Sequence, residues 1–119
     1  MKRKIDGDTI SIVDNDDTIV LTIKITVEEA AVTIAAAGSI THDAAPEFED
    51  ELMSVLTSGR DVVVDFSALE YISAPALRAL LSVQKLVDEK RYKFIIQNIS
   101  KPVKDIFEQT GFIDLIEIH

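Results

Sequence analysis

Three polar side chains surround the point where an apolar segment gives way to a helical pattern. Asp65 and Ser67 follow the apolar run 62–64, and Ser73 stands two residues before Pro75. A serine nucleophile would need a neighbouring base and a third group that orients this base. Hydrolytic or transfer chemistry at this point therefore depends on whether the chain supplies a histidine.

The chain contains two histidines, His42 and His119, and only His42 could serve a serine at position 67 or 73. Asp65 is better explained as a strand-end carboxylate that accepts N–H groups of the following loop. Ser67 is better explained as a turn-forming hydroxyl. We predict that the protein is not an enzyme.

Cofactor and metal patterns are also missing from the sequence. The glycines at 7, 38, 59 and 111 are too dispersed for a phosphate-binding loop. Cysteine is absent, and no histidine stands at ligand spacing from a group of carboxylates. We expect no cofactor and no metal. Binding of a small ligand at a strand-end crevice remains an alternative that depends on fold analogy alone.

The stretch Asp61–Leu81 is expected to position these polar side chains. The run of three valines at 62–64 predicts a strand buried on both faces, as in a parallel sheet. A short loop, Ala68–Ile72, is expected next, and Pro75 marks the first turn of a helix. Ser73 is then placed to cap the helix.

Before this stretch, alternating apolar residues predict strands at Thr9–Val13, Thr18–Val27 and Ala31–Ala37, which form an N-terminal β-meander. All three prolines open helical patterns. The first helix is expected to end at Gly59 and the third at Gly111. A strand, Tyr92–Gln97, separates the second helix from the third. We predict an α/β fold with a mixed sheet and helices mainly on one face.

The composition of the 119 residues predicts one domain with a hydrophobic core. The net charge of −9 disfavours contact with nucleic acid. The apolar region Ile19–Gly38 is interrupted by charged residues and does not predict a membrane span. The basic start of the chain runs into Asp6 and Asp8, so we expect no signal peptide and a cytoplasmic location.

The segment 62–81, VVVDFSALEYISAPALRALL, resembles the signature of STAS domains, the family of anti-sigma factor antagonists and their relatives. Gly38–Thr41 and Ala45–Phe48 are similar to the family's G-x-L-D and A-P-E-L motifs. Asn98–Val103 and Thr110–Phe112 resemble its V-S-x-P-V and T-G-L turns. The resemblance implies a STAS fold over residues 18–119, with residues 1–17 as an N-terminal extension that can hold an extra strand.

The resemblance also implies a regulatory position at the helix start. Phosphorylated members of the family have the pattern Ile/Met, Asp/Ser, Ser, any residue, Gly, Leu. The serine at the third position of this pattern is the phosphoacceptor. Ile72 and Ser73 match the first two positions, but Ala74 occupies the acceptor position and has no hydroxyl. The resemblance therefore leaves a second interpretation of Ser73, as a displaced phosphoacceptor in place of a helix cap. Thr41 departs similarly from the aspartate of relatives. The residues expected to bind a partner are Thr41, His42, Asp43, Ser73, Ala74, Pro75, Ala76 and Arg78.

From this resemblance we expect a bacterial protein-interaction module in transcription regulation. Its partner would be an anti-sigma factor or a serine-kinase-like protein, and the usual phosphoserine switch would be absent. An alternative is a structural STAS subunit of a lipid-transport complex or a stress-sensing assembly. In that case the strand Thr9–Val13 could pair with a partner or with a second copy as a homodimer, because exposed sheet edges invite pairing.

Overall fold

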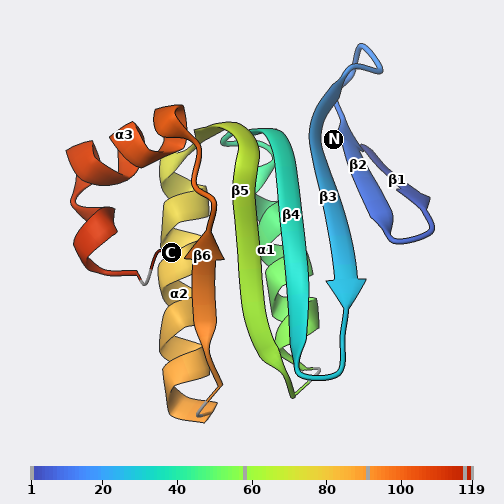
Figure 1. Ribbon diagram of the computed structural model, residues 1–119. Coiled ribbons are helices and arrows are strands. Elements are labelled where there is room, and N and C mark those ends of the chain that lie inside the picture. The colour runs from blue at the N-terminus through green and yellow to red at the C-terminus, as the bar shows by residue number, and fades with distance from the viewer. Residues whose placement is uncertain (1, 58, 91, 117, 119) are drawn as a thin grey trace.

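The computed structural model describes residues 2–57, 59–90, 92–116 and 118, which build one six-stranded mixed sheet with the strands in chain order. The first four strands are antiparallel, whereas β4, β5 and β6 are parallel to one another (Figure 1). The predicted mixed sheet is therefore confirmed. The strands are β1 (Lys2–Asp6), β2 (Thr9–Val13), β3 (Ile19–Val27), β4 (Ala31–Ile40), β5 (Asp61–Ile72) and β6 (Phe94–Gln97).

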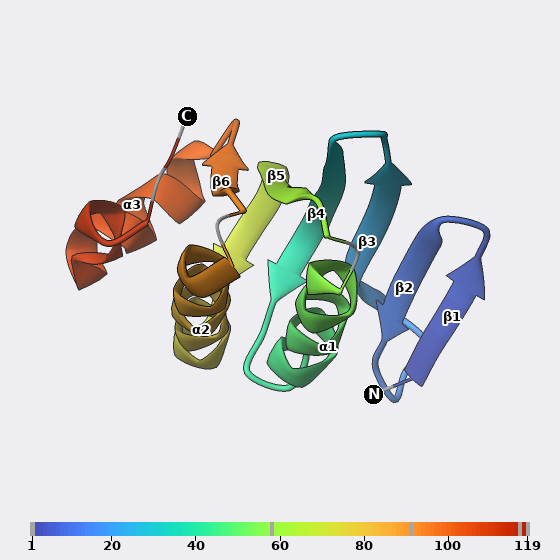
Figure 2. The same ribbon diagram turned by 90° about the horizontal axis from the view of Figure 1, so that it is seen from below.

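A helix follows each parallel strand: α1 (Ala45–Leu56), α2 (Ala74–Lys90) and α3 (Lys101–Thr110), the last continued by the 3₁₀ helix η1 (Phe112–Asp114). Figure 2 shows α1 and α2 against one face of the sheet, with α3 beyond β6. Because the parallel strands run in one direction, their carboxyl ends and the three helix starts lie at the same edge of the sheet (Figure 1). Open α/β sheets generally place their functional surfaces at this edge.

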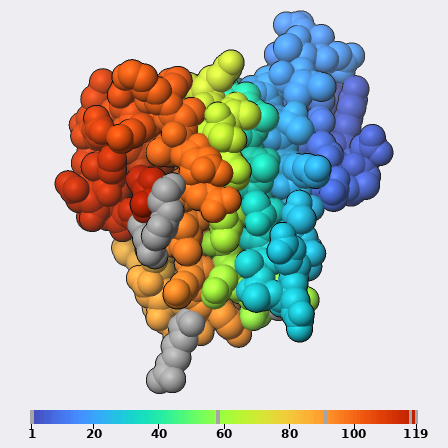
Figure 3. Space-filling model, in the orientation of Figure 1, coloured from blue at the N-terminus to red at the C-terminus, as the bar shows by residue number. Residues whose placement is uncertain are grey.

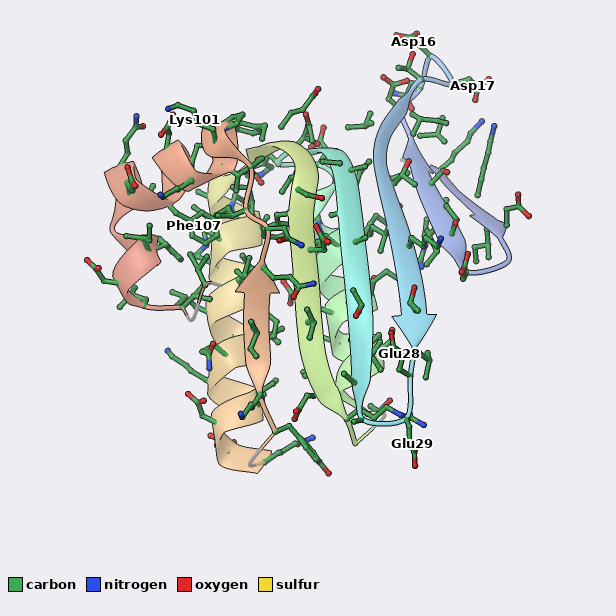
Figure 4. All side chains as sticks on the ribbon, viewed as in Figure 1. Asp16, Asp17, Glu28, Glu29, Lys101 and Phe107 are labelled. Atoms are coloured by element: carbon green, nitrogen blue, oxygen red, sulfur yellow. The ribbon has the colours of Figure 1, made fainter. Side chains whose placement is uncertain are left out.

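The core lies between the sheet and its helices. The apolar stripes predicted for the first two helices are buried, including Phe48 and Leu52 of α1 and Leu80 and Val83 of α2. In α3, Val103 and Phe107 are buried, and Phe107 (Figure 4) belongs to the same core. Pro46, Pro75 and Pro102 all stand in the first turns of their helices, where a missing N–H leaves no hydrogen bond unmade.

The N-terminal meander has four strands, one more than predicted, and this corrects the expected edge. The strand Thr9–Val13 pairs with β1 on one side and with β3 on the other, so its backbone is not free to bind a partner. Its Ile10 and Ile12 enter the common core. The edge strand is instead β1, which the sequence did not reveal because all its side chains are exposed and Ile5 is its sole apolar residue.

The loop predicted at Ala68–Ile72 is also wrong, because β5 continues in pairing with β4 up to Ile72. The register shifts twice along this ladder, between Ala35 and Ala37 and again between Gly38 and Ser39. Each shift inserts one extra residue into β5, as in a β-bulge. These insertions interrupt the alternation of side chains, and the sequence of a bulged strand then reads as a loop.

Three other boundaries differ from the prediction. β4 extends beyond Ala37 to Ile40, and β6 begins at Phe94, later than the predicted Tyr92. Gly59 has a φ of 71° but lies beyond the end of α1 at Leu56, so it serves the turn into β5. Gly111, with a φ of 80°, ends α3 as predicted. None of the helices in the described part of the chain has the length and hydrophobicity that crossing a bilayer requires.

Candidate protein-docking site at the start of α2

The parallel pairing of β4 and β5 brings the two predicted segments together. Ile40 and Ile72, the last residues of the two strands, are register partners. Directly after them, the N–H of Ser73 donates a hydrogen bond of 2.9 Å to the C=O of Ile40. The loop 41–44 and the start of α2 therefore form one continuous surface at the edge of the sheet. The two segments are distant in the sequence, and the pairing of β4 with β5 brings them side by side.

A hollow of about 370 Å³ opens between the starts of α1 and α2. It contains His42, Asp43 and Pro75, three of the residues expected to bind a partner. It also contains residues that the sequence did not indicate. The acids among them were explained by the helix dipole, which acidic side chains in the first turns of a helix complement. The missed lining residues are Ala45, Pro46, Glu49 and Asp50.

The carboxylates of this hollow are unneutralised within the described ranges 2–57, 59–90, 92–116 and 118. Asp43, Glu49 and Asp50 are exposed and form no ion pair there. The other acids of α1 behave differently, since Glu47 and Glu51 both pair with Arg3 of β1. The hollow thus carries three carboxylates on the side of α1 and Pro75 on the side of α2.

The start of α2 is only partly accessible. Ala74 and Arg78 are exposed and Pro75 is half-buried, so these three can contact another protein. Ser73 is 4% exposed and Ala76 is 0% exposed. Of the expected partner-binding residues, Ser73 and Ala76 therefore support the surface from below and do not form it.

The predicted capping role of Ser73 is wrong for its side chain. The residue does stand at the cap position, because its C=O accepts the N–H of Leu77 at 3.0 Å. Its hydroxyl, however, is buried and has no hydrogen-bond partner among the described residues. The N–H bond to Ile40 holds the residue close against the end of β4. In this conformation the hydroxyl is buried, and Ala74 next to it is exposed without a hydroxyl.

Thr41 stabilises the loop that enters α1. Its Oγ1 accepts the N–H of Ala44 at 3.1 Å, and its C=O accepts the N–H of Ala45 at 3.0 Å. N–H groups at a helix start need acceptors from outside the helix, and a hydroxyl or a carboxylate can supply one. A threonine in place of aspartate therefore supplies the acceptor without adding another negative charge beside the hollow.

Asp65 accepts hydrogen bonds as predicted, but it lies within β5 and not at a strand end. Its Oδ1 accepts the N–H of Ser67 at 2.8 Å, and its Oδ2 accepts the side-chain N–H of Asn98 at 3.3 Å. Partial burial of Asp65 tends to raise its pKa, but the hydrogen bonds from Ser67 and Asn98 outweigh burial and hold the pKa below its usual value. The carboxylate thus ties the bulged part of β5 to the turn between β6 and α3.

This hydrogen bonding predicts a pH dependence of stability. A carboxyl whose pKa is lowered by folding stabilises the protein above its unfolded pKa, here 3.8, and loses this contribution as the pH falls through the folded value. Asp65→Asn should therefore lower the free energy of unfolding by up to about 1 kcal/mol at pH 7, and by less as the pH falls below 3.8. Urea denaturation at several pH values measures this. Glu89→Gln on the exposed surface of α2 corrects for general charge effects, and an equal loss at all pH values would contradict the prediction.

The side chains that the sequence singled out for chemistry differ in accessibility at this site. His42 lines the hollow, whereas Ser73 is buried beneath the surface. Among the residues that the structure describes, no three His, Cys, Asp or Glu side chains converge as metal ligands would. The arrangement offers a partly apolar, partly acidic surface, and such a surface is suited to contact with another protein.

Comparison with known proteins gives the family. The sequence profile of the STAS domain matches residues 22–119. BtrV of Bordetella bronchiseptica, which is assigned as an anti-sigma factor antagonist, is 29% identical over 82 residues, covering 68% of this chain and 71% of BtrV.

Solved structures of other proteins share the fold. An anti-sigma factor antagonist from Mycobacterium paratuberculosis superimposes with a TM-score of 0.75 at 16% identity, covering 91% of this chain and 90% of the other. The antagonist SpoIIAA in its unphosphorylated form gives a TM-score of 0.68 at 16% identity, with coverage of 82% and 87%. The chain belongs to the STAS domain family.

Proposed function

We propose that this protein is a non-enzymatic interaction module of the anti-sigma factor antagonist type. It binds an anti-sigma factor or a serine-kinase-like protein through the start of α2 and the loop 41–44, and so acts on transcription in the cytoplasm. The observation that carries the proposal is the surface itself. Exposed Ala74 and Arg78 lie in the first turns of α2, and Pro75 of the same turn lines a hollow between two helix starts, at the sheet edge where α/β proteins generally bind ligands.

The same surface supports regulation without the usual phosphoserine switch. The position that resembles the phosphoacceptor is Ala74, and the neighbouring hydroxyl of Ser73 is buried. A kinase partner would thus find no accessible acceptor at this point. Affinity purification of the partner from the native cell, followed by calorimetric titration with and without Mg·ATP, tests the proposal. We expect binding that ATP does not reverse, and ATP-driven release with phosphate on Ser73 would refute the unswitched mechanism.

The charge of the hollow predicts the chemistry of the partner's contact. Asp43, Glu49 and Asp50 favour a lysine or arginine side chain in the hollow, because opposite charges across an interface steer association and stabilise the complex. The double variant Glu49→Lys, Asp50→Lys should weaken binding of the purified partner about tenfold or more. Surface plasmon resonance at two salt concentrations measures both the loss and its ionic-strength dependence.

A matched control for this variant lies at the other end of the same layer of helices. Asp88→Lys, Glu89→Lys makes the same change of net charge, at two exposed acids in the last turn of α2 and thus at the opposite end of this helix from Pro75 (Figure 1). We expect it to leave the affinity within about a factor of two, as for charges outside an interface. An equal loss in the control and in the double variant would show that the net charge, and not the hollow, governs binding.

A further inference from the structure

The sheet is protected at one edge and open at the other. Beyond β6, Ile118 forms an isolated parallel bridge with Ile96, and α3 lies on this side (Figure 2). At the opposite edge, β1 pairs with β2 and with no second strand among the residues that the structure describes. The hairpin of β1 and β2 forms this margin of the molecular surface (Figure 3). An unpaired strand edge is a template for another strand.

The hairpin geometry determines which backbone groups of β1 point outward. The register pairs Asp6 with Thr9 across the two-residue turn at Gly7, whose φ is 61°. Residues that close a two-residue hairpin exchange their hydrogen bonds, and bonded and non-bonded pairs then alternate. Lys4 therefore bonds to β2 with Asp6. The N–H and C=O groups of Arg3 and Ile5 point away from the sheet and are available to a partner.

β1 is also held in place before any partner arrives. The Nε of Arg3 lies 3.4 Å from Oε2 of Glu47, and its guanidinium also bonds to Glu51, which is 7% exposed. Both glutamates belong to α1. This anchor fixes the edge strand against the helix layer, so pairing would require little additional ordering of the strand.

The side chains of β1 are complementary to a second copy of themselves. Ile5 is 69% exposed, the most exposed of the large apolar side chains in the described ranges. Lys4 and Asp6, its neighbours, are exposed and form no ion pair with any described residue. In antiparallel self-pairing centred on Ile5, the sequence Lys4-Ile5-Asp6 places isoleucine opposite isoleucine and each lysine opposite an aspartate.

We propose that two copies of the chain associate through β1, antiparallel about a two-fold axis at Ile5. The outward N–H and C=O of Ile5 bond to the same groups of the second copy, and the two sheets become continuous. The adjacent registers are disfavoured because they place Lys4 opposite Lys4 or Asp6 opposite Asp6 at the axis. The proposal is independent of the docking function, since the start of α2 lies away from β1 (Figure 1).

Charge exchange at the axis tests both the dimer and its register. Sedimentation equilibrium of the full chain up to about 1 mM should show a species of twice the monomer mass, as for a weak to moderate dimer. Lys4→Asp and Asp6→Lys each place like charges opposite one another and should weaken dimerisation at least tenfold. The double variant Lys4→Asp, Asp6→Lys restores opposite charges and should recover the dimer.

Ile5→Pro supplies a second test that spares the fold. It removes an N–H that points away from β2, and proline is tolerated on such an edge. The variant should be monomeric with an unchanged circular dichroism spectrum.

Three results would each overturn the proposal. These are a wild-type monomer throughout the concentration range, a dimer indifferent to the single charge changes, and failure of the double variant to recover the dimer. If an acidic peptide strand binds β1 while the chain stays monomeric, the edge serves a different partner and the dimer is equally excluded.

Discussion

Ala74→Ser should convert a constitutive binder into one that a kinase can switch off. Ala74 is exposed at the first turn of α2, so a serine there presents its hydroxyl to a bound kinase. With Mg·ATP and a partner that has kinase activity, we expect phosphate at position 74 and dissociation of the complex. The wild-type complex should persist under the same conditions.

The physical reason lies on the partner's side of the interface. Phosphorylation adds a charge of about −1.5 to −2, which a helix start tolerates because its N–H groups and dipole favour anions. The partner, however, would have to bury this charge unpaired, beside a hollow that already contains three carboxylates. We expect burial of this charge to reduce the binding free energy by at least about 2 kcal/mol, which corresponds to about 30-fold weaker binding. Calorimetry before and after phosphorylation, with the site identified by mass spectrometry, measures the effect.

Two control variants test whether the ATP response requires a hydroxyl at position 74. Ala74→Val adds bulk without an acceptor and should remain indifferent to ATP. Ser73→Ala removes a buried hydroxyl that has no hydrogen-bond partner among the described residues, so stability should stay the same or rise by about 1 kcal/mol. Phosphorylated Ala74→Ser that still binds with wild-type affinity would show that the start of α2 is not the docking surface.

Gly38→Ala should cause the largest loss of stability of any single methyl addition to the chain's glycines. A Cβ at this position would lie 2.4 Å from the backbone oxygen of Val20 on β3, and the residue has a φ of 102°. Neither conflict can be relieved by a side-chain rotation, because the obstacle is backbone. We expect a loss of about 3 kcal/mol or more, from the strained φ together with the overpacking.

The effect should reach the docking site. Gly38 lies where the pairing of β4 with β5 shifts register, just before Ile40 and the loop that begins at Thr41. A displaced β4 would move this loop relative to the start of α2 and weaken partner binding as well as stability. Thermal and urea denaturation measure the stability, and a midpoint lower by about 10 °C is expected for a domain of this size.

Gly111→Ala is the matched control. Gly111 also has a positive φ, 80°, but a Cβ there would meet no atom of the described residues within 4 Å. Its substitution therefore reports the cost of the left-handed backbone alone, about 1–2 kcal/mol. If Gly38→Ala costs no more than Gly111→Ala, the close approach of β3 and β4 does not constrain this position.

Local sequence patterns determined the helices and the core. Proline at each helix start and apolar residues at helical spacing identified α1, α2 and α3, because both signals act within a few residues of the chain. Ile10, Ile12 and the alternation of β3 indicated a half-buried sheet for the same reason. The resemblance of residues 62–81 to the STAS signature gave the family, which the profile match over residues 22–119 confirms.

Only the tertiary structure decided the edges and the surface. β1 carries no apolar pattern that would predict a strand. Pairing with β2 and the ion pairs of Arg3 with α1 hold it in place, and both are contacts of the tertiary structure. The last residues of β5 read as a loop because bulges broke their alternation, although pairing with β4 keeps them extended. Burial of Ser73 and the hollow beside Pro75 arise where two strands end side by side, and such contacts between residues distant in sequence leave no local pattern to read.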